Sequence, residues 1–147
     1  MNFAVILPNL FVGRCLCDPA EFEQLKSQGV TAILSLQSAE DLQQEGWAEA
    51  EAQAKNMVFR NVPVTDFDVR DLEYMLPACV RELDGLIAAG HTVYLHCTAG
   101  VSRSPTVAAA YLHWRLNWPL AQALARVRET RDCCPLGQVI ERARRPA

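Results

Sequence analysis

A short loop between an apolar run and an alanine-rich run constrains this chain more than any other segment. Residues 97–103 read Cys-Thr-Ala-Gly-Val-Ser-Arg, so five residues separate Cys97 from Arg103. Residues 92–96 are apolar and β-prone, and residues 105–112 begin with proline and favour a helix. The order strand, loop, helix points backbone N–H groups and the positive end of a helix dipole at the loop centre. A loop of this kind, called here the 97–103 loop, can enclose one phosphate group.

The residue types around this loop predict nucleophilic chemistry on phosphorus. Cysteine attacks as the thiolate, which a helix N-terminus and a nearby arginine both favour at Cys97. We expect Ser104 to donate a hydrogen bond to the sulfur and His96 to hold the cysteine in place. Because the loop supplies positive charge itself, we expect no metal and no cofactor. The predicted phosphate-binding residues are Thr98, Ala99, Gly100, Val101, Ser102 and Arg103, whose guanidinium can hold two oxygens.

The run from His96 to Ser104 resembles the signature of the cysteine-dependent protein tyrosine phosphatase superfamily, HCxxGxxR followed by serine or threonine. The resemblance covers essentially the whole chain and is to the small dual-specificity type. It implies metal-independent hydrolysis of phosphomonoesters through a phosphocysteine, by a protein phosphatase that accepts phosphotyrosine and phosphoserine or phosphothreonine.

The leaving group of such a reaction needs a proton from an acid across the pocket. In the dual-specificity branch an aspartate about thirty residues upstream of the cysteine supplies it, and Asp66 lies 31 residues before Cys97. We predict that Asp66 is the general acid of the first step and the general base of the second. Asp68 and Asp71 are the alternatives, and one of them is expected to cap the following helix.

Several segments are similar to the glucan phosphatases, the laforin and plant starch-excess group. They include 8–13, 33–37, 66–68 and the start of the 97–103 loop. This resemblance implies that Phe67 contacts glucan chains, with Asp68 beside it on the substrate rim; the alternative is an ordinary packing aromatic. We therefore carry three functions: a protein phosphatase first, a glucan phosphatase second, and a non-catalytic phosphate-binding module third.

Composition favours a compact enzyme. With 147 residues, half of them apolar, the chain suits one phosphatase domain over 1–147. The net charge of −3 gives no reason to expect nucleic acid, and the apolar runs are too short to span a membrane. The N-terminus lacks the basic start of a signal peptide. Because Cys97 must stay reduced, we expect a cytoplasmic location. The oligomeric state, and any disulfide between Cys97 and another cysteine, stay open.

Hydrophobic periodicity predicts an α/β fold. The predicted strands are 4–7, 10–13, 32–36, 58–62 and 92–96, and the predicted helices are 19–28, 48–55, 72–89, 105–112, one through 120–127 and one through 136–143. This alternation implies a single domain with a mostly parallel sheet of about five strands, helices on both faces and the loop at its carboxyl edge. Arginines near the C-terminus form either a docking surface or a solvated helix face: Arg126, Arg128, Arg131, Arg142, Arg144 and Arg145.

Overall fold

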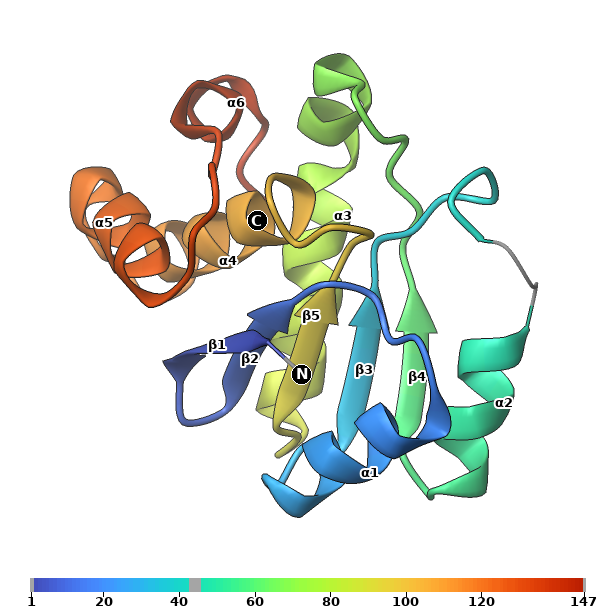
Figure 1. The fold of residues 1–147 in the computed structure, drawn as a ribbon. Helices are drawn as coiled ribbons and strands as arrows, with labels where there is room; N and C mark the ends of the chain where they lie inside the picture. Colours follow the sequence, from blue (N-terminus) through green and yellow to red (C-terminus); the bar gives the residue numbers. More distant parts are fainter. Residues whose placement is uncertain (1, 43–45, 147) are drawn as a thin grey trace.

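The computed structural model describes residues 2–42 and 46–146, and the elements named below all lie in that part of the chain (Figure 1). In chain order they are β1 (Phe3–Leu7), β2 (Leu10–Gly13), α1 (Pro19–Ser27), β3 (Ala32–Ser35), α2 (Trp47–Ala54), β4 (Val58–Asn61), α3 (Val69–Ala88), β5 (Val93–His96), α4 (Arg103–Trp114), α5 (Leu120–Thr130) and α6 (Gly137–Arg142).

The five strands form one sheet in the order β1-β2-β5-β3-β4. β1 pairs antiparallel with β2, and the other neighbours are parallel. The register places Ser35 of β3 beside His96 of β5 and beside Asn61 of β4. The carboxyl ends of three parallel strands therefore meet at one edge, and the chain leaves each strand there on its way to a helix.

Alternation along the strands divides the core into two parts. Ile33 and Tyr94 face the side covered by α1 and α2, where they pack with Phe22. Leu34 and Leu95 face the opposite side, where α3, α4 and α5 cover the sheet and α6 packs against α3 and α4 (Figure 1). Because successive side chains of a strand point to opposite faces, one four-residue strand supplies both cores. These observations confirm the predicted α/β class, the mostly parallel sheet and the helices on both faces.

Aspartates start two of the helices. Asp18 accepts a hydrogen bond from the backbone N–H of Glu21 at the start of α1, and Asp68 accepts from that of Asp71 at the start of α3. Periodicity predicts that α3 begins at Leu72, about one turn after its start in the structure. Asp68 caps it earlier, because its side chain satisfies an N–H group that has no partner inside the helix.

No helix within residues 2–42 and 46–146 is long and apolar enough to cross a membrane. The predicted domain limits, residues 1 and 147, lie outside the described residues.

Candidate active site

The 97–103 loop joins β5 to α4, and each carbonyl from Cys97 to Ser102 accepts a hydrogen bond from a group of the surrounding protein. The donors are Nδ1 of His96 to Cys97, the N–H of Cys15 to Thr98, the guanidinium of Arg131 to Ala99 and Gly100, the N–H of Cys134 to Val101, and the N–H and hydroxyl of Thr106 to Ser102. The N–H and C=O of one peptide point in opposite directions. The N–H groups of residues 98–103 therefore point to the inside of the loop, and none has an acceptor among the described residues.

The start of α4 adds to this positive environment. Ser102 occupies the N-cap position but its side chain makes no capping hydrogen bond. Residues 103–112 are all buried, so the helix runs from the loop directly into the core. An uncapped helix N-terminus carries partial positive charge and free N–H donors, which suit a bound anion.

Gly100 permits the tight curvature of the loop. Its φ is +71°, a region that side-chain-bearing residues rarely adopt. A Cβ at this position would lie 2.6 Å from the carbonyl carbon of Gly13 and 2.7 Å from Nη2 of Arg131. Both the conformation and the close approach of β2 require glycine here.

Cys97 lies at the base of the loop and is 2% exposed. Its Sγ is 3.2 Å from the hydroxyl of Ser104, which is fully buried and 3.5 Å from the carbonyl of Gly13. A thiolate accepts hydrogen bonds, so the Ser104 hydroxyl can donate to it. The structure thus brings Ser104 against the Cys97 sulfur. All six cysteines are free in the structure.

His96 supports the cysteine from the strand side. Because a carbonyl only accepts, the 2.9 Å contact to Cys97 requires a proton on Nδ1 of His96. Its Nε2 is buried without a hydrogen-bond partner in the described structure. Burial and, less strongly, the charge of Arg103 lower the pKa of His96 to about 4, although the hydrogen bond to the Cys97 carbonyl works to raise it. His96 is therefore neutral near pH 7 and acts by orienting the loop backbone.

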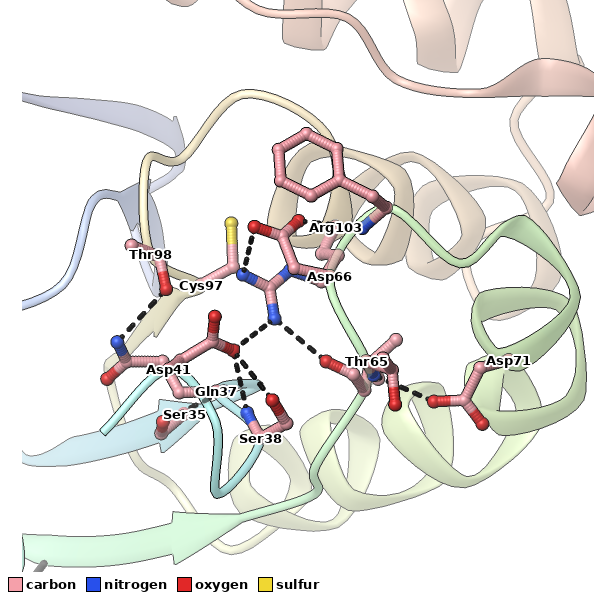
Figure 2. Close-up of polar contacts among 12 residues, drawn as sticks. Ser35, Gln37, Ser38, Asp41, Thr65, Asp66, Asp71, Cys97, Thr98 and Arg103 are labelled. Carbon is pink, nitrogen blue, oxygen red and sulfur yellow. Dashed lines mark hydrogen bonds and ion pairs between the residues drawn. The ribbon is translucent and has the colours of Figure 1, made fainter. Parts of the chain in front are cut away.

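Arg103 is the centre of the polar contacts in the pocket (Figure 2). Its Nη1 donates to Oδ2 of Asp41 at 2.6 Å and to the carbonyl of Val64 at 2.8 Å. Its Nη2 lies 3.3 Å from Oδ2 of Asp66. A guanidinium that is 3% exposed needs such partners, since an unpaired buried charge is costly.

Asp41 holds Arg103 from the loop that follows β3. Its Oδ2 also accepts from the backbone N–H of Ser38 at 2.8 Å and from the Ser38 hydroxyl at 3.1 Å. Burial works to raise the pKa of Asp41, but the hydrogen bonds from Arg103 and Ser38 outweigh it, so the pKa is lowered. Asp41 therefore remains a carboxylate and fixes one edge of the guanidinium.

The three candidate acids have different partners. Asp68 caps α3, and Asp71 accepts from the backbone N–H of Thr65 at 2.7 Å. Asp66 is the one of the three that reaches Arg103, and about a third of its side chain is exposed to the pocket. The expected capping aspartate is thus Asp68, and Figure 2 shows the Asp66 carboxyl beside the Arg103 guanidinium and near the Cys97 sulfur.

These groups surround a pocket of about 480 Å³. Its lining comes from the segment before α3, the first turn of α3, the 97–103 loop and the residue before α6: Thr65, Asp66, Phe67, Asp68, Val69, Leu72, Cys97, Ala99, Val101, Ser102, Arg103 and Leu136. Phe67 stands out, because its side chain is 99% exposed and its φ is +57°. Phe67 is therefore not a packing aromatic, and its backbone has a conformation that is uncommon for residues other than glycine.

Sequence reasoning missed three side chains that support the site. Asp41 binds Arg103, Gln37 donates to the hydroxyl of Thr98 at 3.1 Å, and Arg131 binds two loop carbonyls. The first two follow β3, whose carboxyl end lies beside that of β5, so the sheet edge is a signal that could have found them. The sequence predicts Arg131 on a docking surface or a solvated helix face. It lies instead after α5 and against the 97–103 loop.

Comparison with known proteins gives one family and several relatives. Residues 12–139 match the family model described as "Dual specificity phosphatase, catalytic domain". The chain is 34% identical over 149 aligned residues to "Phosphoglucan phosphatase DSP4, amyloplastic" of Castanea sativa, covering 97% of this chain and 40% of that protein. It is 30% identical to "Dual specificity protein phosphatase 22" of Xenopus tropicalis, covering 87% of this chain and 56% of that protein.

The chain thus spans between two-fifths and just over half of the length of these two relatives. Among solved structures, Tk-PTP in its active form superposes with a TM-score of 0.76 at 22% identity, covering 95% of this chain and 90% of the other. That likeness confirms the fold.

The neutral state of His96 makes folding stability depend on pH. Its folded pKa of about 4 lies below the ordinary value of about 6.5, so between those values the unfolded chain binds more protons. Neutral His96 makes its full contribution to the free energy of unfolding above about pH 6.5. As the pH falls toward 4, up to roughly 3 kcal/mol of that free energy is lost. Urea unfolding of the wild type and of His96→Asn should show a difference in unfolding free energy that narrows over this range. A difference that stays constant from pH 7 to 4 would contradict a neutral buried imidazole.

Proposed function

Because this chain belongs to the dual specificity phosphatase family, we propose that it hydrolyses phosphomonoesters through a phosphocysteine on Cys97. The observation that carries the proposal is the 97–103 loop, whose inward N–H groups and buried Arg103 surround the cysteine sulfur. Three free oxygens of a phosphoryl group would accept from these donors. The charge that develops on them in the transition state is stabilised by the same groups, which are already in place.

In the first step the thiolate of Cys97 attacks phosphorus, an S–P bond forms and the P–O bond to the leaving group breaks. The phosphoryl oxygens take the place of the Asp66 carboxylate at Nη2 of Arg103. Asp66, protonated in the enzyme–substrate complex, gives its proton to the leaving oxygen. Asp41 stays on Nη1 and keeps the guanidinium in position throughout.

In the second step water attacks the phosphocysteine, and the carboxylate of Asp66 accepts a proton from that water. The S–P bond breaks and Cys97 leaves as the thiolate, with the Ser104 hydroxyl 3.2 Å away as hydrogen-bond donor. The products are inorganic phosphate and free enzyme. Since Cys97 must stay a thiol, a reducing compartment such as the cytoplasm is the location that suits this cycle.

Phosphoproteins are the first candidate substrates. The pocket combines an open rim with a loop whose side chains, Thr98, Ala99 and Val101, carry no charge. Such a pocket selects for the phosphate monoester rather than for a highly anionic headgroup. Similarity to a dual specificity protein phosphatase supports this candidate.

Phosphoglucan is the second candidate, and Phe67 is the observation that favours it. The ring is fully exposed beside Asp66, and the flat faces of sugars stack on aromatic rings. Similarity to a phosphoglucan phosphatase over nearly the whole chain supports the same candidate.

The covalent mechanism is tested by Cys97→Ser. This variant should lose turnover of p-nitrophenyl phosphate and still bind phosphate or vanadate, because the donors of the loop are mostly backbone N–H groups. Turnover by the wild type should persist in excess chelator. Activity that survives the serine change would rule out a phosphocysteine. A wild type that binds phosphate but hydrolyses no phosphomonoester would instead be a non-catalytic phosphate-binding module.

The acid is tested by a matched pair, Asp66→Asn and Asp68→Asn. Asparagine caps a helix about as well as aspartate, so the second variant keeps the start of α3 intact. Asp66→Asn should lower the rate of hydrolysis of alkyl phosphates such as phosphoserine by roughly 100-fold or more. The rate for activated aryl phosphates should fall less, because only poor leaving groups need the proton. Asp68→Asn should change both rates little. The opposite ranking would move the general acid to Asp68.

The substrate class is tested on three substrates in parallel: a phosphotyrosine peptide, a phosphoserine peptide and phosphorylated amylopectin. Phe67→Asn removes the ring, and asparagine tolerates the left-handed backbone of this position. Tyr74→Ala is the control, since Tyr74 is an exposed aromatic of α3 outside the pocket lining. A loss on amylopectin alone, seen for Phe67→Asn and not for the control, supports phosphoglucan. Equal losses on all three substrates would favour phosphoprotein.

A further inference from the structure

Arg131 binds the two peptides that flank the single glycine of the 97–103 loop. Its Nη2 donates to the carbonyl of Ala99 at 3.1 Å and its Nε to the carbonyl of Gly100 at 2.9 Å. The first carbonyl belongs to the peptide before Gly100 and the second to the peptide after it. One side chain from the segment between α5 and α6 therefore sets the direction of both peptides.

These two peptides are the ones most able to rotate. Gly100 has no Cβ and lies at φ +71°, so it changes backbone conformation at less cost than its neighbours. Rotation of either peptide would turn a carbonyl oxygen into the pocket and an N–H away from it. A carbonyl oxygen there repels phosphate oxygens, since both carry negative charge.

The contacts of Arg131 differ from those of nearby arginines. Arg126 pairs with Glu129, whereas Arg128 is exposed and has no hydrogen bond or ion pair within residues 2–42 and 46–146. Arg131 has no carboxylate partner in that part of the chain, and its third nitrogen donates to the carbonyl of Asn2 at 3.3 Å. Three carbonyl acceptors satisfy its donors without neutralising its charge, which therefore adds to the positive field around the loop.

We propose that Arg131 is a positioning residue: it holds the N–H groups of Gly100 and Val101 toward the bound phosphate and acts on catalysis through them. This role rests on the proposed phosphatase function. It requires that Arg131 affect every oxyanion the loop binds, however small, because its target is the loop and not the substrate.

The test compares Arg131→Gln and Arg131→Lys with Arg128→Gln, which removes an equal charge from the same part of the chain. The readouts are vanadate affinity, kcat and KM for p-nitrophenyl phosphate, and the melting temperature. Arg131→Gln should weaken vanadate binding and lower kcat/KM by roughly 10- to 100-fold, the factor for losing one or two hydrogen bonds from a charged donor. Arg131→Lys should keep more of the vanadate affinity and kcat/KM than Arg131→Gln but less than the wild type, since an ammonium group lacks the fork that spans two carbonyls. Arg128→Gln should match the wild type.

Chemical rescue separates positioning from general stability. Guanidinium ion added to Arg131→Ala should restore part of the lost activity and vanadate affinity, and the same concentration of ammonium ion should not. If Arg131→Gln or Arg131→Ala fails to fold, the lysine variant carries the comparison.

Three results would overturn the proposal. One is wild-type vanadate affinity in folded Arg131→Gln or Arg131→Lys. Another is a loss confined to phosphopeptide or phosphoglucan, which would make Arg131 a substrate contact. The third is an equal loss in Arg128→Gln, which would reduce the effect to net charge. A wild type that binds vanadate but hydrolyses no phosphomonoester would contradict the proposed function instead, and the vanadate comparison would still decide the role of Arg131.

Discussion

The inward direction of the N–H groups in the 97–103 loop is the constraint on which the rest of the site depends. Each inward N–H turns a carbonyl outward, and a carbonyl left without a donor in a folded protein costs free energy. The outward carbonyls are satisfied by groups from four regions: the end of β5, the segment after β2, the start of α4 and the segment between α5 and α6. The anion site is thus a product of how these regions pack together.

Arg103 imposes a second constraint, because its charge is buried. Two carboxylates reach it from loops that follow neighbouring parallel strands, Asp41 after β3 and Asp66 after β4. They are not equivalent. Asp41 is further fixed by Ser38, whereas Asp66 is more exposed and makes the longer contact. Such an arrangement keeps the guanidinium oriented on one side and leaves the other side available to exchange a carboxylate for a phosphate.

Sequence analysis succeeded where the signal is local. Alternating and helical periodicity located the strands and helices of the described residues within a few residues, and aspartates ahead of an apolar helix predicted a cap without deciding between Asp68 and Asp71. The strand–loop–helix order predicted that Cys97 and Arg103 share one pocket, with Ser104 against the cysteine sulfur. Sequence analysis failed where the contact joins distant segments. Arg131 lies among other arginines, and nothing in that charge pattern distinguishes it from a solvated neighbour such as Arg128.

The sequence by itself determined the α/β class, the loop and the residue types that can carry phosphate chemistry, because these depend on short-range periodicity and on a contiguous run from His96 to Ser104. Only the tertiary structure decided which carboxylates bind Arg103, which aspartate caps α3, and which arginine binds the peptides on either side of Gly100. For Arg131 the physical reason is the packing of the segment between α5 and α6 against the 97–103 loop, and for the carboxylates it is the parallel sheet. It brings the carboxyl ends of β3, β4 and β5 to one edge, so residues separated by tens of positions become neighbours that no local pattern records.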